Sequence, residues 1–432
     1  MGDKLLDPHY PFNPARTPFF YGWVIWLLSV LGFLVSIPGQ TMGMAVFTEP
    51  FLEAFDVTRT ELSLAYFFGT IVSSLFLTTA GRWFDLYGGR IMVTLSSFAL
   101  GLMIIFISLI DLLNNFLELS ALSIVFIFLG YLGVRFFGQG VLTSCSRNVL
   151  MPWFVSRRGL VSGLRGAFVS VGFSLAPLPL AILIAEFGWR ETLWLLALVA
   201  GVLFPLLSYL FLRDKPEDIG LFADGGPVEF DAIREEAPSK TLAEARLSMI
   251  FWLYSGALGI HALFGTALTF HIVSIFQEAG RAMEEAFLYF VPVAIFSTIV
   301  NLLASMKIDR YPLRPFLITM LVGFTGGAIG LLNLEADWGF WLLALGFGAG
   351  SGLWAVISSL AFIRLFGPLH LGEISGFNTS ITVFASAVGP AAFSLAFDNF
   401  GYYGASVKMC LVALIVLTIA TILVPQKEFG FE

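Results

Sequence analysis

The sequence predicts an all-α membrane protein with twelve transmembrane helices, arranged as two six-helix halves that repeat each other in parallel. Of the 432 residues, 58% are hydrophobic and only 12% are charged, whereas a soluble protein carries about 25% charged residues. Apolar runs recur along the chain, and most exceed the roughly 20 residues that a helix needs to cross a bilayer. They lack the alternating pattern of a transmembrane barrel. A soluble globular fold is therefore excluded.

Charges, prolines and turn residues bound the predicted spans. The first six lie at residues 20–47, 60–83, 90–110, 120–149, 158–185 and 190–212. The second six lie at residues 247–277, 284–304, 314–333, 338–365, 372–397 and 403–424. We thus expect an N-terminal bundle at 20–212 and a C-terminal bundle at 247–424. Residues 213–246 are rich in charges and prolines, which indicates a solvated linker.

The 23 Lys and Arg residues fall mostly in the loops on the side that holds both termini. Cytoplasmic loops carry the excess of basic residues in membrane proteins. We therefore expect residues 1–19 and 425–432 to be cytoplasmic tails and the linker to be cytoplasmic. The short loops and tails favour an inner (plasma) membrane. Cys145 and Cys410 are expected near opposite faces, so no disulfide is predicted.

Two loops show that the halves are repeats. Gly81-Arg-Trp-Phe-Asp85-Leu-Tyr-Gly88-Gly-Arg90 follows the second span, and Ser305-Met-Lys-Ile-Asp309-Arg310-Tyr-Pro-Leu-Arg314 follows the eighth. Spans five and eleven also match in order, at the pairs Gly159 and Gly372, Gly163 and Gly376, and Pro177 and Pro390. Because each half has six spans, both halves start on the same side of the membrane. Parallel repeats of this kind occur in transporters that rock two halves around a central site.

The first loop resembles the signature of the major facilitator superfamily, a Gly followed by an Asp four residues on and then by Gly and a basic residue. Arg135-Phe-Phe-Gly138-Gln139-Gly140 is similar to a second signature of that family, in span four. Tyr21-Gly22-Trp23 and Gly188-Trp189-Arg190 look most like the oxalate/formate antiporter and monocarboxylate transporter branch. This chain departs from that branch in having Gln40 where a span-one Lys is expected, and no basic residue within span eleven. A monoanion or a neutral solute is therefore favoured over a dianion.

The resemblance implies a secondary active transporter that moves a small organic solute, above all a monocarboxylate, by alternating access. It also implies that the paired loops form a gate, in which each Asp lies near a helix N-terminus of the opposite half. An anchoring role for the basic residues is the alternative. The gating set comprises Gly81, Asp85, Gly88, Arg90, Asp309, Arg310 and Arg314.

Arg135 is the main candidate for substrate contact, because it falls near the middle of span four, between Glu118 and Arg157. A charge there costs roughly 2.5–3.5 kcal/mol and faces a cavity or a partner, and no carboxylate in the membrane interior is available to neutralise it. Gln139 lies one turn away. Arg135 is therefore either the contact for an anionic substrate, or coupled to proton movement, or an interhelical clamp.

Other polar residues interrupt apolar spans. His261 and His271 in span seven could carry a coupling proton, or each could make a single interhelical hydrogen bond. Four further side chains could orient a solute, or could equally pack helices together. They are Gln40, Asn301, Trp354 and Asn378. Pro38-Gly39 is expected either to break span one, freeing carbonyls beside Gln40, or merely to kink it.

Signatures of catalysis, metal binding and nucleotide binding were not found, so no enzyme is predicted. The expected partners are a small-molecule solute and the lipid bilayer, with no nucleic acid and with the chain as a monomer. No cofactor is expected apart from a proton that could travel with the solute. The alternatives are an exporter of a neutral or drug-like solute and, ranked lower, a receptor that does not transport.

Overall fold

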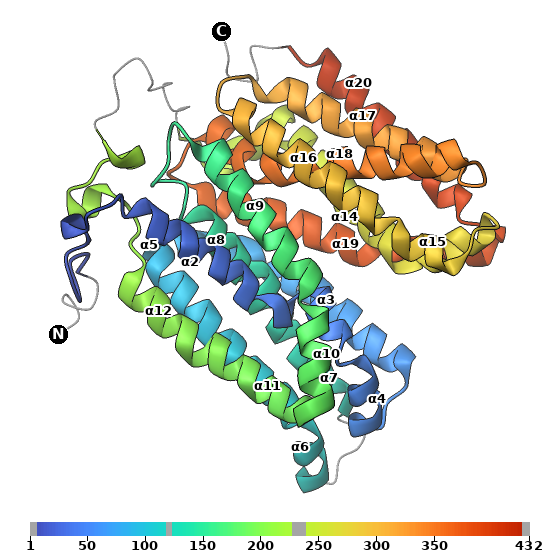
Figure 1. Ribbon diagram of the computed structural model, residues 1–432, viewed down its shortest axis with the longest axis horizontal. Coiled ribbons are helices and arrows are strands. Elements are labelled where there is room, and N and C mark those ends of the chain that lie inside the picture. Colours follow the sequence, from blue (N-terminus) through green and yellow to red (C-terminus); the bar gives the residue numbers. More distant parts are fainter. Residues whose placement is uncertain (1–6, 118–122, 227–238, 426–432) are drawn as a thin grey trace. The chain divides into compact units, whose positions relative to one another are not determined.

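The computed structural model describes residues 7–117, 123–226 and 239–425, and these residues form helices without strands (Figure 1). The ends of both predicted tails, the middle of the predicted linker and Glu118 lie outside the described residues. Helices are the expected solution in a bilayer, because each backbone N–H and C=O must find its partner within the span.

In the first half of the chain, the helices follow the predicted spans closely. Their bounds are α2 (Gly22–Val35), α3 (Thr41–Ala45), α4 (Thr48–Phe55), α5 (Arg59–Ser108), α6 (Ile110–Leu117), α7 (Ser123–Val134), α8 (Thr143–Asn148), α9 (Arg158–Leu175), α10 (Pro177–Phe187), α11 (Trp189–Leu198) and α12 (Phe204–Phe211). Two π-helical stretches continue spans four and six, η4 (Arg135–Leu142) and η5 (Val199–Leu203).

In the second half, a short helix precedes six spans. The bounds are α13 (Leu242–Leu247), α14 (Met249–Glu278), α15 (Met283–Leu288), α16 (Phe290–Ile308), α17 (Leu313–Leu332), α18 (Asp337–Phe366), α19 (Leu371–Phe400) and α20 (Gly404–Leu423). Single 3-10 turns lie at η1 (Pro14–Arg16), η2 (Ile37–Gly39), η6 (Glu217–Ile219) and η7 (Ala223–Gly225).

Ten helical stretches of the described residues are long and apolar enough to cross a membrane. One of them, α5, supplies two crossings, because Gly88 has a φ of 81° and interrupts its helical geometry. The shorter apolar helix α2 supplies the first span. The helices therefore match the twelve predicted spans, and the predicted fold class is confirmed.

Spans one and four depart from a continuous α-helix. The break predicted at Pro38-Gly39 is present: α2 ends at Val35, η2 follows, and Gln40 is extended before α3 begins. The π-helical winding of η4 was not predicted, because a change from i→i+4 to i→i+5 hydrogen bonding leaves no mark in an apolar run. Span four is therefore helical as predicted, with π-helical rather than α-helical winding at Arg135–Leu142.

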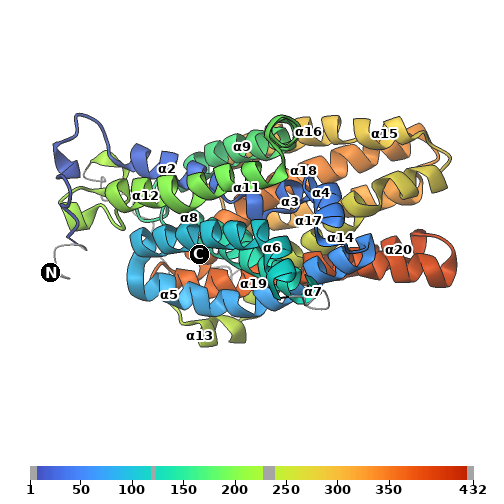
Figure 2. The same cartoon turned by 90° about the horizontal axis from the view of Figure 1, so that it is seen from below.

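The chain divides into two compact units. Unit 1 comprises Met1–Ser156, Phe168–Arg234 and Leu371–Ser380, and unit 2 comprises Arg157–Ala167, Glu235–His370 and Ile381–Glu432. The start of α9 is thus grouped with unit 2 and the start of α19 with unit 1. In unit 1, α5 packs along α7, α11 and α12; in unit 2, α18 packs against α16 and α17, and α17 along α20 (Figures 1 and 2).

Candidate functional site

Arg135 begins the π-helical stretch η4, and its side chain is 2% exposed. Its Nε donates to Thr70 Oγ1 at 3.1 Å, and its Nη1 donates to the carbonyl of Gly39 at 3.1 Å. The guanidinium lies 4.9 Å from the centroid of the Tyr66 ring. The break in span one therefore provides a carbonyl acceptor for Arg135, as a broken helix does where it lines a cavity.

The charge of Arg135 has no acidic partner among the described residues, where the ion pairs involve other arginines. Its Nη2 donates no hydrogen bond to a described atom. This nitrogen is nevertheless accessible to solvent. One donor of the guanidinium is therefore free and reachable. A π-helical turn at this position is typical of functional sites.

Other predicted residues of unit 1 lie apart from the guanidinium contacts. Gln139 has a buried Oε1 without a partner among the described residues, and Asn378 has a buried Oδ1 of the same kind. Gln40 donates from Nε2 to Ser36 Oγ at 3.0 Å. Unpartnered buried amide oxygens are uncommon and call for an explanation, whereas the Gln40 amide has a partner, Ser36, within its own span.

In unit 2, the structure brings His261 and Trp354 together. The His261 ring lies between Phe324 and Trp354, with ring centroids 4.7 Å and 4.9 Å away. Its Nε2 lies 3.2 Å from Ser351 Oγ, and its Nδ1 is buried without a partner among the described residues. Trp354 donates from Nε1 to the carbonyl of Leu258 at 3.3 Å. His261 thus has one ring nitrogen without a hydrogen-bond partner among the described residues, and aromatic rings lie beside it.

Both ring nitrogens of His271 have hydrogen-bond partners. Its Nε2 lies 3.0 Å from the carbonyl oxygen of Pro390, which can only accept, so this nitrogen carries the proton. Its Nδ1 lies 3.3 Å from the Tyr403 hydroxyl, and that hydroxyl contacts Ser274 Oγ at 3.1 Å. The contacts agree with the interhelical alternative for His271, and its role in coupling stays a prediction.

Asp85 binds the start of α19 within unit 1. Its Oδ1 accepts the N–H of Gly372 at 2.7 Å and its Oδ2 accepts the N–H of Glu373 at 2.8 Å. A Cβ at Gly81 would overlap the carbonyl oxygen of Gly372, so only glycine permits this approach. We call this contact the Asp85 latch. An anion at a helix N-terminus is stabilised by the helix dipole and free N–H groups.

Asp309 makes the equivalent contact within unit 2, which we call the Asp309 latch. It accepts the N–H of Gly159, at the start of α9, with oxygens at 2.8 Å and 2.9 Å. Asn301 and Ser305 lie against Gly163 of the same helix. The repeat found in the sequence is therefore repeated in the contacts, and the gating role of both latches stays a prediction.

The remaining residues of the gating set hold helix ends. Arg90 donates to the carbonyl of Tyr209 at the end of span six, and Arg314 donates to the carbonyls of Thr421 and Ile422 at the end of span twelve. Gly88 supplies the positive φ between spans two and three. Arg310 is exposed.

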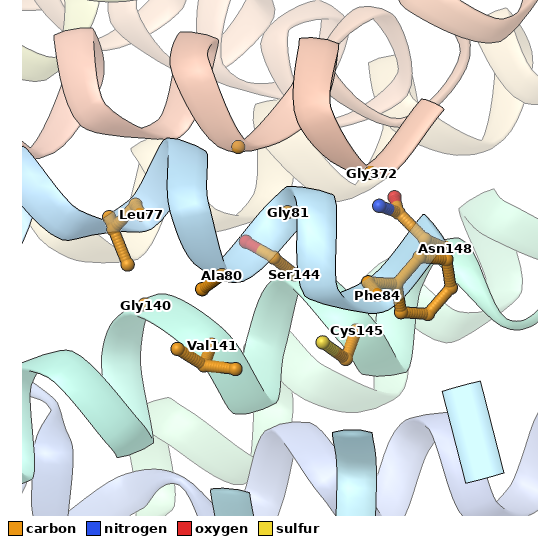
Figure 3. Close-up of a pocket in the computed structure, with 11 residues that line it drawn as sticks. Leu77, Ala80, Gly81, Phe84, Gly140, Val141, Ser144, Cys145, Asn148 and Gly372 are labelled. Carbon is orange, nitrogen blue, oxygen red and sulfur yellow. The ribbon is translucent and has the colours of Figure 1, made fainter. Parts of the chain in front are cut away.

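A small cavity lies beside the Asp85 latch (Figure 3). Gly81, Ser144, Asn148 and Gly372 are among the residues that line it, and its volume of about 10 Å³ is room for about one water molecule. A second hollow of about 510 Å³ is lined almost wholly by apolar side chains of spans two, three and four, among them the exposed Phe76 and Trp83. Neither suits an organic anion.

The sequence reasoning missed the neighbours of Arg135. Tyr66 and Thr70 lie one turn apart on α5, and Thr41 contacts both the Tyr66 hydroxyl, at 2.7 Å, and Arg135, at 3.5 Å. A Tyr and a Thr spaced by four in an otherwise apolar span were the available signal, since such residues share a helix face.

The fold, with its duplicated bundles and a buried guanidinium that has no acidic partner among the described residues, is that of a multi-pass membrane transporter. The family model described as Major Facilitator Superfamily matches residues 28–359, and the chain belongs to that superfamily. Its members are transporters of small-molecule solutes, so this chain is a transporter and not an enzyme.

Two curated relatives are similar to this chain. An uncharacterized 38 kDa protein in the 23S RNA operon of Thermoproteus tenax is 26% identical over 292 residues, 67% of this chain and 68% of that protein. Monocarboxylate transporter 10 of Rattus norvegicus is 25% identical over 281 residues, 62% of this chain and 54% of that protein. The match therefore spans about half the length of the rat transporter.

Solved structures share the fold. The proton:xylose symporter XylE has a TM-score of 0.70 at 14% identity, covering 96% of this chain and 97% of that chain. The human organic anion transporter MFSD10 has a TM-score of 0.58 at 14% identity, covering 94% of this chain and 100% of that chain. At these identities the likeness shows the fold alone.

Proposed function

We propose that this protein is a secondary active transporter that moves a small monocarboxylate by alternating access, with Arg135 as the contact for the carboxylate. The observation that carries the proposal is the free Nη2 of a buried guanidinium without an acidic partner among the described residues. A buried charge is costly unless it is paired. A carboxylate arriving from solvent would supply the missing partner.

The surroundings of Arg135 set the class of anion. One guanidinium can hold one carboxylate, through charge-assisted hydrogen bonds. Nε and Nη1 are already held by Thr70 and Gly39, so the guanidinium is fixed in place and presents its remaining edge. This arrangement favours a monoanion. The 25% identity to the monocarboxylate transporter of the rat points to the same class.

A proton is the expected coupling ion. His261 has a buried Nδ1 without a partner among the described residues, and imidazole changes charge near neutral pH. A monoanion that travels with a proton moves no net charge. We propose His261, rather than the fully bonded His271, as the group to test for coupling.

Alternating access requires contacts that form in one state and break in another. The Asp85 latch and the Asp309 latch are suited to this, because each joins an Asp carboxylate to the start of a helix through two charge-assisted hydrogen bonds. With both termini cytoplasmic, as the basic loops indicate, the latches would close the cytoplasmic side of an inner (plasma) membrane transporter.

Uptake of radiolabelled lactate, pyruvate and benzoate into proteoliposomes tests the proposal. Arg135→Gln is expected to abolish uptake, and Arg135→Lys to retain a part of it, because a single point charge replaces the planar guanidinium. Size-exclusion profiles establish that both variants fold. Undiminished carboxylate uptake by folded Arg135→Gln would overturn the proposal.

A neutral or drug-like cargo is the second candidate, favoured by the aromatic setting of His261 in unit 2, where Phe324, Phe347 and Phe264 pack in contact with one another. Aromatic walls suit apolar solutes. Flux of a lipophilic cation that persists in Arg135→Gln, together with no carboxylate uptake by the wild type, would select this candidate.

A further inference from the structure

A second unpaired guanidinium lies at the cytoplasmic end of span four. Arg147 belongs to α8 and lies twelve residues beyond Arg135, a distance of about 18 Å along a helix at about 1.5 Å per residue. We propose that Arg147, with Ser144 and Thr379, forms a second anion-binding station, which takes the carboxylate of the substrate between Arg135 and the cytoplasm. This inference rests on the proposed carboxylate transport.

The contacts of Arg147 leave most of its donors unused. Its Nη2 donates to Thr379 Oγ1 at 3.4 Å, and this is its single hydrogen bond to a described residue. Its Nε and Nη1 are accessible to solvent. The ion pairs of the described residues involve other arginines, as that of Glu373 with Arg82 does. Arg147 is thus a half-buried cation with two nitrogens available to an anion.

Two buried arginines of the described residues, Arg90 and Arg213, each donate to several carbonyls and so differ from Arg147. Arg90 donates to the carbonyls of Asp7, Tyr10 and Tyr209. Arg213 donates to four carbonyls with its three nitrogens. These arginines hold the chain together. A purely structural role for Arg147 would call for the same pattern of acceptors, because buried donors are normally paired.

Hydroxyl groups surround the guanidinium where a carboxylate would bind. Ser144 Oγ lies 3.4 Å from Thr379 Oγ1, one turn before Arg147 on the same span. Thr379 Oγ1 donates to the carbonyl of Ser375 at 2.8 Å, so a carboxylate could accept from Arg147 and from the Ser144 hydroxyl at once. About 18 Å separates the two arginines along the helix, so one carboxylate cannot bridge them. The substrate would occupy the two stations in succession.

The station lies close to the Asp85 latch. Thr379 is on α19, two turns after Gly372, and Asn148 donates to Ser375 Oγ on that helix at 2.8 Å. Figure 3 shows Ser144 and Asn148 beside Gly81 and Gly372. An anion on Arg147 would therefore bind next to the contact that we propose as a gate.

The test compares the two faces of the membrane. In proteoliposomes sorted by orientation, Arg147→Gln is expected to raise the KM for lactate added at the cytoplasmic face about tenfold, as loss of a hydrogen bond to a charged group does. The KM at the opposite face is expected to stay within about twofold. Arg147→Lys, which keeps the charge, is expected to be intermediate and guards against misfolding of Arg147→Gln.

Arg157→Gln is the matched control, because Arg157 is an exposed arginine of the loop that follows span four. It removes a positive charge from the same side of the membrane and is expected to change neither KM. An equal effect of Arg147→Gln at both faces, an effect at neither face, or the same effect in Arg157→Gln would each overturn the proposal.

A second measurement separates this inference from the proposed function. Cys145 lies two residues before Arg147, and acetate bound at Arg147 is expected to slow its alkylation. In Arg135→Gln the protection is expected to persist although transport is lost, and in Arg147→Gln it is expected to disappear. Protection that is absent in the wild type, or that is unchanged in Arg147→Gln, would overturn the second station whatever the transport assays show.

Discussion

The carboxylate of Asp85 accepts the backbone N–H of Gly372 at 2.7 Å. The sequence repeat equates these two residues with Asp309 and Gly159, and those two are hydrogen-bonded in the same way, at 2.8 Å. Each latch is thus one copy of a duplicated contact between an Asp carboxylate and a helix N-terminus. A charge in this position is worth about 0.3–1 kcal/mol, which is enough to bias an equilibrium without locking it.

Asp85→Asn is expected to open the proposed cytoplasmic gate more often, because the neutral amide interacts less with the N-terminus of α19. The reporter is Cys145, which lines the cavity beside the latch. In a Cys410→Ser background, its rate of alkylation by a water-soluble maleimide is expected to rise about twofold to fivefold. Glu217→Gln removes an exposed carboxylate and serves as the control. An unchanged rate in Asp85→Asn would argue against a gating role.

Gly81→Ala is expected to prevent closure of the Asp85 latch, because the added Cβ would overlap the backbone of Gly372. Overpacking of this kind costs about 1–3 kcal/mol. We expect a large loss of transport rate and a raised rate of Cys145 alkylation. Gly326→Ala is the matched control, since a Cβ there meets its nearest neighbour, the Leu342 side chain, at 3.6 Å. Equal effects of the two variants would show that helix packing in general is at fault.

Much of the fold could be predicted from the sequence, because bilayer thickness and charge placement act on residue types directly. The spans, the duplicated loops and the break at Pro38-Gly39 all follow from where apolar, charged and breaking residues occur. Arg135 could be singled out for the same reason, since a charge in an apolar run is costly wherever the helix packs.

The partners of these residues could not be predicted. Arg135 and Arg90 bind backbone carbonyls, and every residue has a carbonyl, so the acceptors leave no signature in the sequence. The same is true of the π-helical winding at Arg135–Leu142. The contact between Tyr66 and Arg135 joins spans two and four, and its geometry depends on packing that residue types alone do not determine.

Arg90→Gln is expected to destabilise the protein, because three backbone carbonyls lose a charged donor in a buried place. Hydrogen bonds to charged groups are worth about 1.5–3 kcal/mol each, so a drop of several degrees in the Tm of the detergent-purified protein is expected. Arg157→Gln, an exposed change, is expected to leave the Tm unchanged. If Arg90→Gln kept its Tm and lost only transport, Arg90 would belong to the gate and not to the scaffold.

Tyr66→Leu is expected to weaken carboxylate binding, because the ring lies 4.9 Å from the guanidinium of Arg135 and holds it in place. A desolvated cation–π contact is worth about 0.5–2 kcal/mol, so KM for lactate is expected to rise about twofold to thirtyfold. Tyr66→Phe keeps the ring, loses only the contact with Thr41, and is expected to stay within about twofold of the wild type. Equal losses in both variants would assign the effect to the hydroxyl.

The Asp309 latch is expected to give stability a distinctive pH dependence. Burial raises the pKa of the Asp309 carboxyl above its ordinary value of 3.8, although the N–H groups of Gly159 and Leu160 oppose the shift. A carboxyl with a raised pKa binds its proton more tightly in the folded state, so its contribution to stability is complete below the ordinary pKa. That contribution is lost as the pH rises through the raised pKa.

The Tm of the wild type, measured against Asp309→Asn from about pH 3.5 to about pH 7, is therefore expected to fall with rising pH and then to level off. Asn cannot ionise, so the variant removes this titration and leaves the others in place. Asp398→Asn changes an exposed carboxyl and is expected to give a flat difference. A difference between wild type and Asp309→Asn that grows with pH would mean that the two N–H groups outweigh burial, and that the latch is strongest when Asp309 is charged.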